Sequence, residues 1–138
     1  MRKALSVTSG VLLAVFALQF AFAAVGAFTK PADDSAYSLH RINGSVVIPV
    51  LILLMTLFAA LAKAPGKLIG MAILPLGLVV LQPVLAGIAN GLTDDGGATS
   101  TVGLIIGALH AINAIIMVHF VVGVMRGAQK LGQPVEAA

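Results

Sequence analysis

Two copies of a short polar motif stand out in an otherwise apolar chain. Residues 39–43 read LHRIN and residues 109–113 read LHAIN, so a histidine is followed three positions later by an asparagine in both. Residues three apart are neighbours on one face of a helix, and neutral imidazole is a common metal ligand. The pattern therefore predicts a site in which His40 and His110 ligate one metal, with Asn43 and Asn113 beside them.

Two glutamines extend the repeat. Gln19 and Gln82 each precede one motif, each inside an apolar run, and each is followed by small residues four and seven positions later. Amides at these places favour hydrogen bonds to a bound cofactor or between helices. We interpret the chain as a duplicated helical hairpin, whose halves would be related by an axis along the membrane normal. The two histidines would then face each other from the second and fourth helices.

The composition is that of a membrane protein. Of 138 residues 59% are hydrophobic and 9% are charged, whereas soluble domains average roughly 45–50% apolar and about 25% charged residues. The absence of cysteine excludes disulfides, thiolate metal sites, iron–sulfur clusters and thioether-attached haem. The net charge of +3 comes from basic residues scattered between apolar runs, so nucleic acid is not an expected partner.

Four apolar runs reach the roughly 20 residues that a membrane-spanning helix needs. They cover about residues 8–28, 40–62, 68–91 and 102–125, and the short connections favour antiparallel neighbours. The predicted fold is all-α, a single domain over residues 1–138 forming a four-helix transmembrane up-and-down bundle. An alternative reads residues 1–23 as a cleaved signal peptide, with Arg2 and Lys3 before the apolar run and Ala21-Phe22-Ala23 as the cleavage site.

Basic residues at the span ends set the expected orientation. Only Lys30 and Arg41 lie on one side, and six lie on the other: Arg2, Lys3, Lys63, Lys67, Arg126 and Lys130. Both termini are therefore expected in the cytoplasm, with the chain in a bacterial cytoplasmic (inner) membrane. Partners follow from this placement: the lipid bilayer, and either a larger membrane complex or further copies of the chain.

The depth of each polar residue tests the shared site. At 1.5 Å per residue, Gln19, Gln82 and His110 lie about 22–24 Å from the basic end of their helices, and His40 lies about 35 Å from Lys63. The mismatch of about 10 Å between the imidazoles falls to about 4–5 Å if the fourth helix continues to Lys130, a difference that a tilt of about 20° absorbs. His119, nine residues beyond His110, falls on the opposite face and is expected to be structural.

Several functions are excluded by missing motifs. The sequence has no HExxH motif, no glycine-rich phosphate loop and no intramembrane carboxylate pair, so a hydrolytic enzyme is not expected. No span interior carries Asp, Glu, Lys or Arg, which argues against a pump or channel. Whether the chain is an enzyme stays open.

Three stretches, LHRINGSVV, VLQPVLAG and LHAINA, resemble in order and spacing an uncharacterised family of small four-helix bacterial membrane proteins. That resemblance implies four spans and no assigned activity. A shorter stretch, SLHRINGS, is similar to the Ser-x-x-His-Arg-x-x-Gly segment of the cytochrome b subunit of succinate dehydrogenase. The second resemblance implies that Ser38 and Arg41 lie near a quinone. It does not extend to haem ligation, because the second histidine motif of that subunit is absent.

These observations lead to one functional hypothesis and two alternatives. The hypothesis is a small b-type haem or quinone-associated redox protein, with His40 and His110 as axial ligands and Gln19, Gln82, Asn43, Asn113 and Arg41 around the cofactor. The first alternative is a non-catalytic accessory or assembly subunit, in which these polar residues only hydrogen-bond the helices together. The second is a lipid or quinone carrier that uses the same polar level without a metal.

Overall fold

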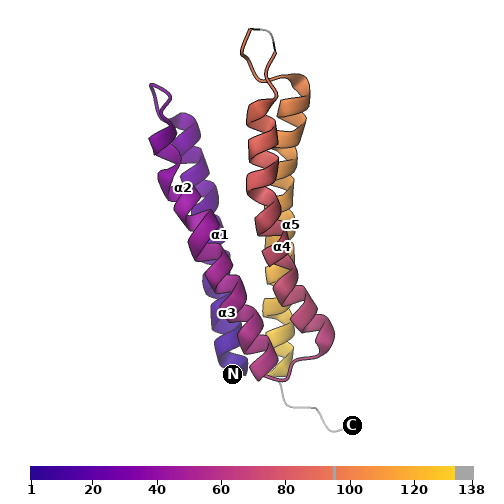
Figure 1. Ribbon diagram of the computed structural model, residues 1–138. Helices are drawn as coiled ribbons and strands as arrows, with labels where there is room; N and C mark the ends of the chain where they lie inside the picture. Colours follow the sequence, from indigo (N-terminus) through magenta and orange to yellow (C-terminus); the bar gives the residue numbers. More distant parts are fainter. Residues whose placement is uncertain (95, 133–138) are drawn as a thin grey trace.

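The computed structural model describes residues 1–94 and 96–132, and within them four long helical spans run side by side (Figure 1). The first is α1 (Arg2–Phe28), the third is α4 (Gly66–Gly91) and the fourth is α5 (Thr101–Leu131). The second is built from η1 (Asp34–Tyr37), α2 (Ser38–Ile42), η2 (Asn43–Val47) and α3 (Ile48–Leu61). Each span is long and apolar enough to cross a membrane, which confirms the predicted all-α, four-helix fold.

The spans form two hairpins. In the first, α1 packs against α2 and α3, and in the second α4 packs against α5. The hairpins meet through α1 with α5 and through α3 with α4, so the two histidine-bearing spans lie diagonally across the bundle, as the repeat predicted. We call the end with the loops 29–33 and 92–100 the outer end, and the end with Met1 and the turn 62–65 the inner end (Figure 1).

The helices extend beyond the predicted spans at the inner end. The first helix begins at Arg2 and the last continues to Leu131, past the predicted limits at residues 8 and 125. The spans were bounded by apolar composition, whereas backbone hydrogen bonding continues through charged turns that lie outside hydrocarbon. The added turns of α5 supply the extra length that the depth comparison of His40 and His110 required.

The second span is irregular just after its polar motif. The N–H of Ile48 bonds to the carbonyl of Asn43, five residues earlier, which defines the π-helix η2. Pro49 follows in the first turn of α3 and has no N–H to offer the carbonyl of Ser45, so the helix widens ahead of it. In the fourth span the equivalent position, nine residues after the histidine, is His119, and α5 remains a regular helix.

A tight turn joins the hairpins at the inner end. The Ala64 N–H bonds to the carbonyl of Ala59, and the Lys63 N–H bonds to that of Ala60. Lys63 adopts a left-handed backbone with φ of 53°, the position that glycine usually takes where a helix ends this way. Pro65 then precedes the first turn of α4.

The apolar core occupies the inner and middle parts of the bundle. Side chains from all four spans meet there: Leu5, Leu12, Phe16, Ile48, Ile52, Met55, Ala59, Ala72, Ala114, Met117, Val121, Val124 and Ala128. Toward the outer end the two hairpins diverge (Figure 1). The hairpins are therefore held together mainly over their inner and middle portions, and α2, which carries the first polar motif, lies in the outer part of the bundle (Figure 1).

Candidate functional site

The structure brings the two predicted imidazoles together. The ring centroids of His40, on α2, and His110, on α5, lie 6.4 Å apart, and their planes are inclined by 42°. Both side chains are half-buried between the hairpins. The continuation of α5 to Leu131 is consistent with this match in depth, since it adds the length that the shared site needed.

Each ring is oriented by a backbone carbonyl of its own hairpin. His40 Nδ1 lies 3.1 Å from the carbonyl oxygen of Gln19, and His110 Nδ1 lies 3.1 Å from that of Gln82. A carbonyl oxygen can only accept, so Nδ1 carries the proton and donates in both rings. The neutral ring then keeps its lone pair on Nε2. This is the usual arrangement of a ligating histidine, whose second nitrogen donates to a carbonyl and fixes the tautomer.

The two asparagines repeat the same scheme one turn further on. Asn43 Nδ2 donates to the carbonyl of Val15 at 3.2 Å, and Asn113 Nδ2 donates to the carbonyl of Leu78 at 2.8 Å. Val15 and Leu78 each lie four residues before the glutamine of their hairpin, and both asparagines are buried. The polar contacts are therefore duplicated, which supports the interpretation of the chain as a repeated hairpin.

The two glutamines differ. The Gln19 side chain curls over His40: its Nε2 lies 3.3 Å from His40 Nε2 and donates to the His40 carbonyl at 3.1 Å, while its Oε1 accepts from Asn43 Nδ2 at 2.8 Å. The Gln82 Oε1 atom is buried and has no hydrogen-bond partner among the residues that the structure describes. Gln19 thus caps the free nitrogen of His40, and Gln82 has an unused acceptor.

One methyl group explains this difference. Gly44 follows His40 by four residues, and a Cβ placed there would lie 2.8 Å from Gln19 Nε2, closer than two such atoms approach. The equivalent residue after His110 is Ala114, which has that methyl group and is buried. The space that the Gln19 amide occupies in the first hairpin is therefore filled in the second.

An aromatic contact near His40 was not predicted. The edge of the Tyr37 ring packs on His40 with centroids 6.2 Å apart, and Tyr37 fills the space beside Gly26. In the second hairpin the equivalent positions hold Gly107 and Ala89, with the Ala89 methyl 3.9 Å from a Cβ built on Gly107. The sequence signal for this contact was Gly26, because a residue without a side chain leaves room for a large neighbouring side chain.

Two further residues lie away from the paired imidazoles. The Arg41 guanidinium donates to the backbone carbonyl of Asp34 at the outer end, so it stabilises the start of the second span. His119 is exposed on the outside of α5 with its ring against Phe120, consistent with the opposite face predicted for it. Neither arrangement brings the side chain to the imidazole pair.

The distance between the two ring centres matches that of two imidazoles on one metal ion. Metal–nitrogen distances of about 2 Å on opposite sides of one ion place the ring centres roughly 6 Å apart, close to the 6.4 Å between His40 and His110. Among residues 1–94 and 96–132 no group of three or more His, Cys, Asp or Glu side chains is placed to hold a metal. The described part of the chain offers two imidazoles at this place, and the Gln19 amide must turn away from His40 Nε2 before that atom can contact a metal.

These features define a multi-pass helical membrane protein made of two similar hairpins, with two imidazole rings close together between them. DUF6220, a family of unknown function, matches residues 19–90, a little over half of the chain, and the chain belongs to this family. The match begins at Gln19 and includes the LHRIN motif and Gln82, and it ends before the LHAIN motif. No curated protein and no solved structure matches the chain, so the local similarity to the succinate dehydrogenase subunit gains no support.

Proposed function

We propose that this protein is a small electron-transfer protein of the bacterial inner membrane that holds a b-type haem between its hairpins. The observation that carries the proposal is the 6.4 Å separation of the His40 and His110 rings, each oriented through Nδ1 by a carbonyl. Two protein ligands suffice only where the other ligands of the metal come from elsewhere, and a porphyrin supplies four in a plane.

The residues of the chain would hold the ligand set rigid. The carbonyls of Gln19 and Gln82 fix the tautomer of each imidazole, and the asparagines tie each second helix to its first. The buried Gln82 Oε1 offers an acceptor to a donor group near His110. A haem bound there would carry one electron at a time between partners, with quinone or a larger membrane complex as the expected donor or acceptor.

An absorbance spectrum tests the proposal, and the third histidine is a matched control. The full chain is expressed with a haem precursor and purified in detergent. We expect a Soret band and low-spin α and β bands that are lost in His40→Ala and in His110→Ala and kept in His119→Ala, because His119 lies on the outer face of α5. A colourless wild type, or a band that survives in the double variant His40→Ala/His110→Ala, overturns the proposal.

A second function is favoured by a different observation. Every side-chain hydrogen bond of the residues named above joins two partners of the same hairpin, as in Gln19–His40 and Gln82–His110. Such bonds also serve simply to pair helices, at about 0.6–2 kcal/mol each, which suits an accessory or assembly subunit. A colourless protein that comigrates with a larger membrane complex supports this function, and a monodisperse haem protein free of partners contradicts it.

A further inference from the structure

A crevice of about 270 Å³ opens at the inner end of the second hairpin, far from the imidazoles. It lies between the first turns of α4 and the last turns of α5. One wall is formed by Lys67, Leu68 and Met71, and the other by Gly127, Lys130 and Leu131. The crevice thus combines an apolar lining with two cationic side chains contributed by different helices.

The shape of α4 creates this crevice. Figure 1 shows the first turns of α4 bending away from the bundle axis, and α4 contains Pro75, which is fully buried, and Pro83. A proline in a helix removes one backbone hydrogen bond and produces a kink. Gly127 lets α4 and α5 approach closely at the base of the crevice, because a Cβ there would lie 2.5 Å from Leu68 Cδ1. The crevice therefore follows from fixed features of two helices.

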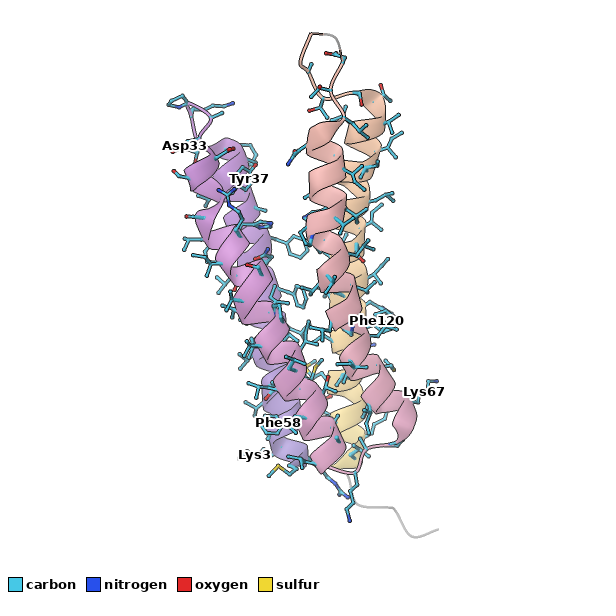
Figure 2. The ribbon with its side chains drawn as sticks, in the orientation of Figure 1. Lys3, Asp33, Tyr37, Phe58, Lys67 and Phe120 are labelled. Carbon is cyan, nitrogen blue, oxygen red and sulfur yellow. The ribbon has the colours of Figure 1, made fainter. Side chains whose placement is uncertain are left out.

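Charge is distributed unevenly along the bundle. Lys67 and Lys130 are exposed at the crevice mouth, and Arg2 and Lys3 lie at the same end of the molecule. The carboxylates that the structure describes, Asp33, Asp34 and Asp94, belong to the outer end. Figure 2 shows Asp33 at one end of the bundle and Lys3 and Lys67 at the other. The two crevice lysines thus lie at the basic end of the bundle, with the described acidic residues a full helix length away.

We propose that this crevice binds an anionic phospholipid, with the phosphate between Lys67 and Lys130 and the acyl chains against Leu68, Met71 and Leu131. Basic pockets between helices at the cytoplasmic interface are suited to acidic headgroups. A free anion would contact the lysines without using the apolar wall. A zwitterionic lipid would use the wall, but the positive charge of its headgroup would oppose the attraction between its phosphate and the two lysines. The combination selects a lipid with net negative charge, independently of whether the protein binds haem.

Native mass spectrometry of the full chain in detergent tests this site. Phosphatidylglycerol is titrated against phosphatidylcholine, using wild type, Lys67→Gln, Lys130→Gln and their double variant. Because each lysine near an anionic headgroup is worth roughly 1 kcal/mol, we expect phosphatidylglycerol affinity to fall about five-fold in each single variant and about 25-fold in the double. The variant Lys67→Arg/Lys130→Arg keeps both charges and is expected to retain binding.

The matched control is Arg2→Gln/Lys3→Gln, which removes two positive charges from the same end but outside the crevice. Its phosphatidylglycerol affinity is expected to stay within two-fold of wild type. Three results overturn the proposal: an equal loss in the control variant, which would indicate only general surface charge; equal binding of phosphatidylcholine by wild type; and displacement of the lipid by millimolar inorganic phosphate, which would indicate a soluble-anion site.

Discussion

The two hairpins share the same hydrogen bonds from histidine and asparagine to backbone carbonyls. They differ in whether the glutamine side chain also contacts the histidine. In both, histidine Nδ1 donates to the carbonyl of a glutamine and asparagine donates to a carbonyl one turn earlier. Only in the first does the glutamine side chain also cover the imidazole, because Gly44 leaves the space that Ala114 fills in the second. Backbone acceptors therefore fix the ring orientation, and a single methyl group decides whether its second nitrogen is capped.

The largest difference in stability between matched substitutions in the two hairpins is expected when a methyl group is added near the outer end. In Gly26→Ala the new Cβ would overlap the Tyr37 ring, which must move, and we expect a loss of about 1–3 kcal/mol in the free energy of unfolding. In Gly107→Ala the Cβ meets Ala89 at 3.9 Å, an ordinary contact, and we expect almost no loss. Titration with SDS in mixed micelles measures both, and equal losses would contradict the comparison.

The second largest difference in stability is expected when the asparagine of each motif is replaced. Asn43→Leu removes two hydrogen bonds and leaves Gln19 Oε1 without a donor, so we expect a loss of about 1–2 kcal/mol. Asn113→Leu removes one bond to a carbonyl, and a loss of about 0.6 kcal/mol is expected. The same unfolding titration applies. If Asn113→Leu were the more damaging change, the second hairpin would depend on its asparagine in a way that the contacts do not reveal.

Exchanging the residue after each motif should make one hairpin resemble the other. Gly44→Ala fills the space beside Gln19 Nε2 and displaces that amide from His40, at an expected cost of about 1 kcal/mol for the disrupted bonds. Nitrogen-15 NMR of the ring nitrogens would then show the His40 Nε2 resonance moving toward that of His110. Ala114→Gly is the reciprocal change, and a His40 resonance that does not move in Gly44→Ala would refute the explanation offered for the cap.

The smallest effect concerns the outer loops. The Ser35 hydroxyl and backbone N–H donate to the Asp33 carboxylate and hold its pKa below the usual value. The stabilisation is therefore complete above the ordinary aspartate pKa and is lost as the pH falls through the lowered one. We expect acidification to lower the melting temperature of wild type by no more than about 2 °C relative to Asp33→Asn. Identical acid profiles for wild type and Asp33→Asn would show that Asp33 does not contribute to the pH dependence of stability.

The sequence predicted those features of the fold and the site that depend directly on residue type. Apolar run length predicted four helices, and the spacing of LHRIN and LHAIN predicted that His40 and His110 would meet. The acceptors at Val15 and Leu78 could not be predicted, because a backbone carbonyl leaves no mark in the residue type. The inequality of Gln19 and Gln82 was equally hidden. It depends on which helix face Gly44 and Ala114 present to the partner helix, and that is settled only by packing.

The internal closure of each hairpin has a consequence for how such a chain could arise. Since the polar groups of Gln19, His40 and Asn43 are satisfied within the first hairpin, and the hairpins join through apolar side chains, no polar surface had to be created when two hairpins were linked. A single ancestral hairpin could have paired with an identical copy across a twofold axis. The four-residue linker at 62–65 would then only convert a dimer into one polypeptide, after which the halves were free to become unequal.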